Sequence, residues 1–157
     1  MLPSVYIETT IPSYLTAWPS GDLIRAGHQK VTRDWWASRR GDFTLYISQL
    51  VLDEAGDGDE AAAADRLRAL DEIPLVPATE QSGELAELLL SKVPLPAKAA
   101  VDAAHIAIAA CGNMDFLLKW NCRQINNAEL APKLEAVCRD FGVTCPVICT
   151  PEELMGL

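Results

Sequence analysis

An apolar segment at positions 99–111 constrains the fold more than any other part of the chain. Every residue in it is apolar except Asp102 and His105. This composition predicts a helix buried on nearly all sides, which begins after Pro96 and ends at Gly112. Because burying an unpaired carboxylate costs several kcal/mol, Asp102 is expected to face a pocket, a cation or strong hydrogen-bond donors. His105 lies beside it, three residues further on.

Strand-like and helical segments alternate along the sequence. Strands are expected at 5–7, 43–47, 74–77, 115–120 and 146–149, and helices at 22–40, 48–54, 59–71, 79–90, 99–111 and 128–141. Prolines at both ends of segment 74–77 favour an edge of the sheet. The alternation predicts a three-layer α/β/α fold with a mostly parallel central sheet. A length of 157 residues, half of them hydrophobic, fits a single domain spanning residues 1–157.

Charge and cysteine content narrow the function classes. A formal net charge of −9 argues against a broad basic surface that binds nucleic acid non-specifically. It does not exclude a nuclease, because a carboxylate site for divalent cations is acidic when empty. The five cysteines contain no C-x-x-C pair and are expected to be reduced core residues. Since no apolar run has membrane-spanning length and the first residues lack a basic signal-peptide region, we expect a cytoplasmic protein.

Polar side chains at the ends of the predicted strands are candidates for a site. Glu8 follows the strand at 5–7, and Asn121 follows the strand at 115–120. The carboxyl ends of parallel strands meet at one edge of a sheet, where open α/β folds place ligand groups. Asp102 can reach the same edge from its helix. For Glu8 taken alone, an ordinary strand-end glutamate is the simpler interpretation.

A further acid is expected from the helix that Ser48 begins. Glu54 shares a helix face with apolar Leu50, whereas Asp53 aligns with Gln49, so Glu54 is the candidate that points inward. Without the other carboxylates, a surface acid would be the simpler interpretation of Glu54.

The chemistry of such a cluster follows from its charges. Several acids around one cavity repel each other and would protonate or separate unless a cation joined them. Oxygen ligands suit Mg²⁺ or Mn²⁺, and these ions favour phosphodiester hydrolysis by a metal-activated water. The sequence has neither a G-x-S-x-G nucleophile motif nor a glycine-rich phosphate loop.

Four segments carry more information when they are read together: VYIETT, SQLVLDE, PAKAAVDAAHIAIAA and LLKWN. In this order and spacing they resemble PIN-domain ribonucleases, particularly VapC-type toxins of toxin–antitoxin pairs, over almost the whole chain. The resemblance implies a PIN-like α/β/α domain that binds Mg²⁺ or Mn²⁺ and cleaves RNA. It also implies a homodimer and an antitoxin partner that inhibits the enzyme by inserting a segment into the active-site groove.

The resemblance also assigns roles residue by residue. Glu8 matches the first acidic ligand, with Thr9 as the adjoining hydroxyl, while Glu54 and Asp102 match the second and third acids. Asn121 stands where a further acid is usual. Two departures matter: Glu8 has one more methylene than the usual aspartate, and Asn121 lacks the negative charge. A single metal ion is therefore expected.

Further roles stay open at the level of sequence. Asn126 and Asn127 are candidates for additional ligands or substrate contacts, although a turn or a helix cap explains either one more simply. His105 is interpreted as a hydrogen-bond donor behind the site, with contact to substrate as the alternative. The leading hypothesis is a metal-dependent endoribonuclease that is the toxin of a type II pair. The alternatives are a catalytically weak PIN-like module that binds RNA or a protein partner, and a phosphatase-like metalloenzyme.

Overall fold

Four parallel strands form the centre of the molecule. The computed structural model describes residues 1–96, 99–121 and 128–156. The strands are β1 (Ser4–Ile7), β2 (Thr44–Tyr46), β3 (Phe116–Leu118) and β4 (Val147–Cys149), in the spatial order β2-β1-β3-β4. In the register of the sheet, Tyr6 of β1 lies between Tyr46 and Leu117. Strand β1 is therefore central, and its carboxyl end lies between the carboxyl ends of β2 and β3.

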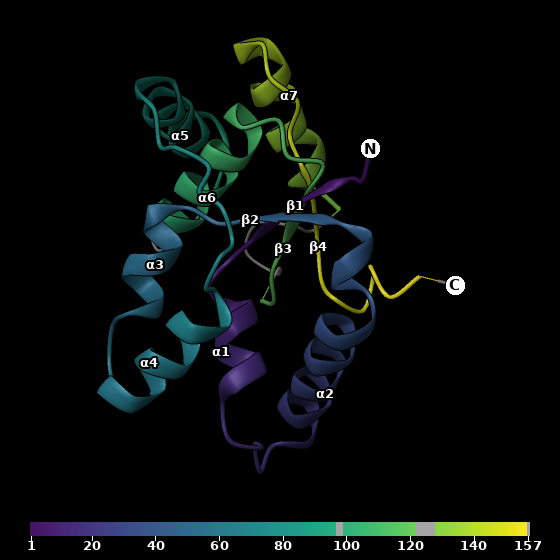
Figure 1. Cartoon of the computed structure of the whole chain (residues 1–157). Coiled ribbons are helices and arrows are strands. Elements are labelled where there is room, and N and C mark those ends of the chain that lie inside the picture. Colours follow the sequence, from purple (N-terminus) through teal and green to yellow (C-terminus); the bar gives the residue numbers. More distant parts are fainter. Residues whose placement is uncertain (97–98, 122–127, 157) are drawn as a thin grey trace.

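Helices cover both faces of this sheet. They are α1 (Thr10–Thr16), α2 (Leu23–Ser38), α3 (Gln49–Ala55), α4 (Glu60–Ala69), α5 (Glu80–Lys92), α6 (Ala100–Cys111) and α7 (Ala131–Phe141), with a short 3₁₀ turn η1 (Arg40–Asp42). Figure 1 shows α5, α6 and α7 on one side of the sheet and α1, α2 and α4 on the other. Helix α5 packs against α6 and α7, and α1 packs against α2 and α4. The predicted three-layer α/β/α architecture is confirmed.

Burial explains why the central elements form where they do. Val5, Tyr6 and Ile7 of β1 are fully buried, as expected for a parallel strand covered on both faces. Helix α6 is buried continuously from His105 to Ala110, which confirms the predicted core helix. Its first turn is more open, since Val101 is exposed. Asp102 therefore lies where the helix leaves the core, and His105 begins the buried stretch.

Side-chain hydrogen bonds fix where two of the helices begin. Ser48 begins α3, and its hydroxyl accepts a hydrogen bond from the N–H of Val51. Thr79 begins α5 in a reciprocal capping box with Ser82. Because Ser48 follows directly on the β2 edge of the sheet, its cap fixes where α3 starts and therefore where the side chains of that helix point.

One predicted strand is only partly formed. Segment 74–77 is not a full strand, because it pairs with the sheet only through the bridge between Ile47 and Leu75. Its prolines have no N–H to donate to a longer ladder.

The described cysteines are free thiols, and two of them, Cys138 and Cys149, are buried. Among the described residues, no helix is both long and apolar enough to cross a membrane.

Candidate metal centre

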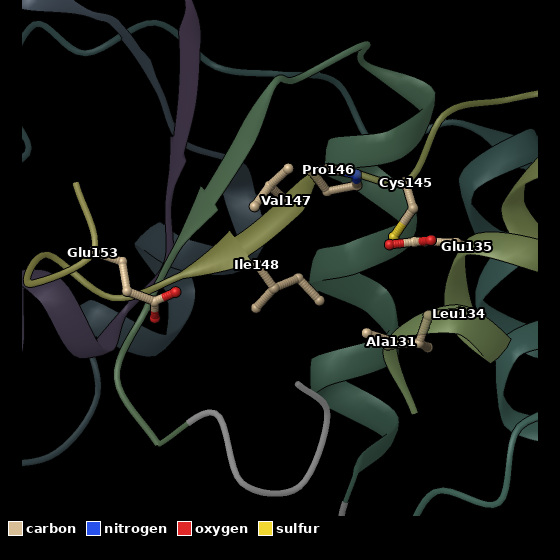
Figure 2. A pocket seen from close by; sticks show the side chains of 8 residues that line it. All are labelled: Ala131, Leu134, Glu135, Cys145, Pro146, Val147, Ile148 and Glu153. Atoms are coloured by element: carbon tan, nitrogen blue, oxygen red, sulfur yellow. The ribbon is translucent and has the colours of Figure 1, made fainter. Parts of the chain in front are cut away.

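A pocket between α7 and β4 is the first place to consider for ligand binding (Figure 2). It has a volume of about 220 Å³, and its lining residues are Ala131, Leu134, Glu135, Cys145, Pro146, Val147, Ile148 and Glu153. None of these residues belongs to the site predicted from the sequence. The two acids in its lining come with six apolar or sulfur-bearing neighbours, so the pocket offers little for phosphate chemistry.

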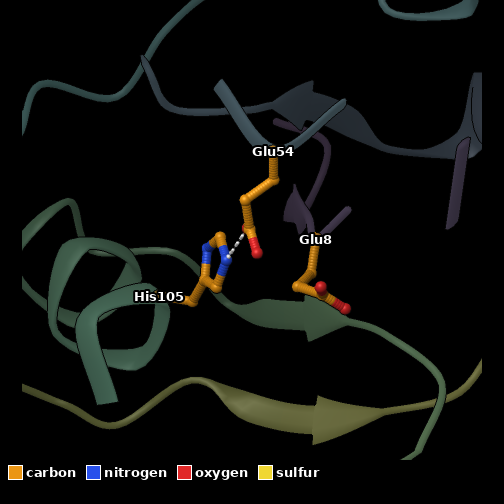
Figure 3. A group of neighbouring side chains, drawn as sticks. All are labelled: Glu8, Glu54 and His105. Atoms are coloured by element: carbon orange, nitrogen blue, oxygen red, sulfur yellow. Dashed lines mark hydrogen bonds and ion pairs between the residues drawn. The ribbon is translucent and has the colours of Figure 1, made fainter. Parts of the chain in front are cut away.

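Three predicted side chains meet instead beyond the carboxyl end of β1. Glu8 follows β1 directly, Glu54 comes from α3 and His105 comes from α6. One ligand atom from each lies within 4.8 Å of the others. Figure 3 shows the three side chains converging from their separate elements, with Glu54 in contact with His105. The fold therefore brings together two of the predicted acids and the predicted histidine.

Glu54 is held by neighbours on two sides. Its Oε1 lies 2.6 Å from Nε2 of His105 and accepts a 2.8 Å hydrogen bond from the Thr9 hydroxyl. Burial raises the pKa of Glu54, but the hydrogen bonds from His105 and Thr9 and nearby positive charge outweigh it and leave the pKa below its ordinary value. Glu54 is therefore an ionised carboxylate with a fixed orientation at neutral pH.

A buried chain of hydrogen bonds holds His105 in turn. Its Nδ1 lies 2.7 Å from the Tyr6 hydroxyl, and that hydroxyl lies 2.6 Å from the Ser48 hydroxyl. Burial raises the pKa of Tyr6, so the phenol stays neutral. When Tyr6 donates to Nδ1, Nε2 carries the proton that is donated to Glu54. Since both ring nitrogens are used, the geometry fits His105 as a donor that positions Glu54.

Glu8 is the most buried acid of the cluster. Its Oε1 accepts a 3.2 Å bond from the Thr10 N–H, and its Oε2 accepts a 2.6 Å bond from the Thr10 hydroxyl. That hydroxyl accepts a bond from the backbone N–H of Trp120. Burial raises the pKa of Glu8, and the charge of Lys119 opposes this only in part. The ionised form of Glu8 therefore gains from any further cation placed beside it.

Asp102 has a different partner. Its Oδ1 accepts a 2.9 Å bond from Nζ of Lys119, and the side chains of Asp102 and Lys119 are 21% and 5% exposed. Of the three partners expected for Asp102, a pocket, a cation or strong donors, the structure shows a cation. The charge of Lys119 also lowers the pKa values of both Glu8 and Glu54. Lys119 was not predicted as part of a site, and its only sequence signal was a lysine inside the apolar run at 115–120.

Of the three predicted asparagines, the structure describes Asn121. Asn121 is exposed and has a left-handed backbone with φ of 59°, which asparagine tolerates better than most residues. It directly follows Trp120, whose N–H reaches Thr10, so the turn lies next to the Glu8 network. A role of Asn121 as a ligand stays a prediction. Asn126 and Asn127 lie outside the described residues.

The donor set fits a hard divalent cation. A carboxylate offers about four lone-pair sites, so the hydrogen bonds to Glu8 and Glu54 leave acceptor capacity for an ion. Oxygen donors of this kind suit Mg²⁺ or Mn²⁺. Glu8 and Glu54 are thus the side chains that would hold the ion, with His105 and the threonines behind them. Asp102 is engaged by Lys119.

Comparisons with known proteins bear on the fold described above. No family model matches the sequence, and no curated protein does. Mycobacterium tuberculosis VapC20, described as a toxin that cleaves the sarcin–ricin loop, is 22% identical, with a TM-score of 0.53 over 72% of this chain and 86% of its own. VapBC2 from Rickettsia felis, solved with a promoter DNA fragment, is 14% identical, with a TM-score of 0.53 over 94% of this chain and 98% of the matched chain.

These likenesses establish a fold. The chain has the PIN-like α/β/α fold of VapC-type toxins, which confirms the resemblance seen in the sequence at the level of architecture.

Proposed function

We propose that this protein is a Mg²⁺- or Mn²⁺-dependent endoribonuclease that hydrolyses RNA phosphodiesters. The observation that carries the proposal is the convergence of the Glu8 and Glu54 carboxylates beyond the carboxyl end of β1. Open parallel sheets place their chemistry at this edge. The fold shared with VapC20, a toxin described as cleaving an RNA loop, supports RNA as the substrate class.

Each residue of the centre has a defined task in this proposal. Glu8 and Glu54 hold the ion, Thr10 orients Glu8, and His105 and Thr9 orient Glu54. The ion, when bound, neutralises charge that develops on the phosphodiester and activates the attacking water. The buried chain behind His105 keeps Glu54 from rotating away, which preserves the geometry on which such electrostatic catalysis depends.

We further propose that the chain is the toxin of a type II toxin–antitoxin pair. Its match to a chain of VapBC2, the complex from Rickettsia felis, supports an antitoxin as partner. Homodimerisation, and action in the cytoplasm where RNA is accessible, belong to the same proposal. Co-expression with the product of a short adjacent reading frame, followed by purification of a complex, tests the partner directly.

The activity is tested with a panel of single-stranded and structured RNAs. We expect cleavage by the wild type with Mg²⁺ or Mn²⁺, and none with a chelator. Glu8→Gln and Glu54→Gln should each lower the rate at least ~100-fold, as removal of an essential electrostatic group commonly does. Asp53→Asn is the matched control, because Asp53 is exposed on the same helix and accepts a bond from Gln49. Equal cleavage by wild type and Glu54→Gln would identify a contaminating nuclease and refute the proposal.

A second candidate is a PIN-like module that binds RNA or a protein without cleaving it. The pairing of Asp102 with the buried Lys119 favours this alternative, since one predicted acid is already neutralised. Ion-independent RNA binding by a protein that cleaves no RNA of the panel would support it.

A further inference from the structure

Lys119 is a buried cation at the same sheet edge as the candidate metal centre. It directly follows β3, and its backbone N–H donates to the carbonyl of Cys149, which continues the ladder with β4. Its side chain is only 5% exposed. A lysine that is buried to this degree needs negative partners, because loss of hydration costs several kcal/mol per ion.

Asp102 supplies negative charge by direct contact, and Glu8 and Glu54 lie close enough to feel the charge of Lys119. Asp102 bonds the ammonium directly at 2.9 Å, and the same charge lowers the pKa values of Glu8 and Glu54. Asp102 comes from α6, Glu8 from the end of β1 and Glu54 from α3. The charge of Lys119 therefore acts on acids from three separate elements. An ammonium group and a divalent ion attract the same oxygens and repel each other, and the repulsion is strong in a partly buried site.

We propose that Lys119 is a built-in counter-ion of this centre, and that its ammonium group competes with the divalent ion for the carboxylates. The inference rests on the proposed metal site and deepens it. In the metal-free protein Lys119 balances Asp102 and the neighbouring acids. Entry of the ion displaces the ammonium towards solvent, which the flexible four-carbon stem of lysine permits. Asp102 then becomes available to the ion.

Metal affinity of a charge-deleted variant tests the competition. Mn²⁺ is titrated into wild type and Lys119→Met, and the free ion is followed by its electron paramagnetic resonance signal. Lys119→Met keeps most of the length of the side chain without its charge, and we expect it to bind Mn²⁺ at least ~10-fold more tightly, within the range of ordinary coupling between two binding events. Lys30→Met is the control, because Lys30 is exposed and pairs with Asp34 away from the centre. It should bind like the wild type.

A double variant identifies the carboxylate for which the two cations compete. If the gain of Lys119→Met comes from release of Asp102, adding Asp102→Asn should remove most of it. A gain that survives in the double variant would assign the competition to Glu8 and Glu54 instead, and would overturn the part of the inference that concerns Asp102.

Lysine acylation of the wild type gives a readout that needs no variant to fold. Saturating Mn²⁺ should raise modification of Lys119 several-fold, as measured by mass spectrometry, because the ammonium leaves its buried site. Exposed Lys30 and Lys133 should react equally with and without the ion. This readout follows the position of the side chain and is independent of RNA cleavage.

The outcomes separate this inference from the proposed function. Equal Mn²⁺ affinity in wild type and folded Lys119→Met, or Lys119 acylation that ignores a bound ion, overturns the inference and leaves the nuclease proposal standing. Binding by Lys119→Met alone supports the inference and counts against metal-dependent cleavage by the natural chain. Absence of Mn²⁺ binding in both proteins overturns the metal centre and the inference together.

Discussion

Replacing Asp102 with asparagine should destabilise the metal-free protein through Lys119. The substitution keeps the shape of the side chain and leaves the ammonium, 5% exposed, without its negative partner at 2.9 Å. Removing one member of a buried ion pair costs ~3–5 kcal/mol. The Asp102 side chain is 21% exposed, and two further acids lie near Lys119. We therefore expect a loss of unfolding free energy at the lower end of this range, about 3 kcal/mol. In a domain of this size that loss lowers the melting temperature by about 6–12 °C.

Urea unfolding followed by circular dichroism, without divalent ions and at neutral pH, measures this loss. Asp34→Asn is the matched control, because Asp34 lies in an exposed pair with Lys30 and should lose less than about 1 kcal/mol. The double variant Asp102→Asn with Lys119→Met should recover part of the loss, with a coupling of about 2 kcal/mol in the double-mutant cycle. Equal stability of Asp102→Asn and Asp34→Asn, with no coupling to Lys119, would refute the account of the buried pair.

Three further predictions concern the two carboxylates of the centre and the tyrosine behind them. Burial holds the pKa of Glu8 above its ordinary 4.5, so ionisation costs wild-type stability as the pH rises from 4.5 through the folded-state pKa. Glu8→Gln should remove that fall, as unfolding free energies measured across the pH range would show. The pKa of Glu54 is lowered, so its contribution to stability is present above pH 4.5 and is lost as the pH falls through the folded-state pKa. Glu54→Gln should therefore lose less stability in acid, and an acid transition identical to that of the wild type would contradict this. Tyr6→Phe removes a buried hydroxyl that contacts both Ser48 and His105, and should cost ~1–3 kcal/mol in urea unfolding.

The layered fold was accessible from the sequence because complete burial leaves unbroken apolar segments. Parallel strands covered on both faces are continuously apolar, as Val5–Ile7 is, and the core helix α6 is apolar nearly all round. Pairing strength is harder to predict. Segment 74–77 has strand-like residues, but its prolines limit it to one bridge.

The candidate centre was predictable in part. Strand-end position and helix face made Glu8 and Glu54 candidates, because both properties follow directly from element boundaries. Asp102 was expected to face a pocket, a cation or strong donors, and it faces a cation. The identity of that cation was missed, because Lys119 lies in an apolar run whose periodicity does not reveal where a long side chain ends.

The role of His105 as the group that orients Glu54 depends on Tyr6 and Ser48, which come from β1 and from the start of α3. Such a chain of contacts combines residues from three elements, and neither composition nor spacing encodes it. Thr10 is a similar case, since it joins Glu8 to the backbone of Trp120.

The most direct test of the central claim is an anomalous-scattering map from crystals of the wild type soaked in Mn²⁺. The account predicts a single strong peak within coordination distance of the Glu8 and Glu54 carboxylates, beyond the carboxyl end of β1. A peak elsewhere, or none at these carboxylates at a concentration that supports RNA cleavage, would contradict it.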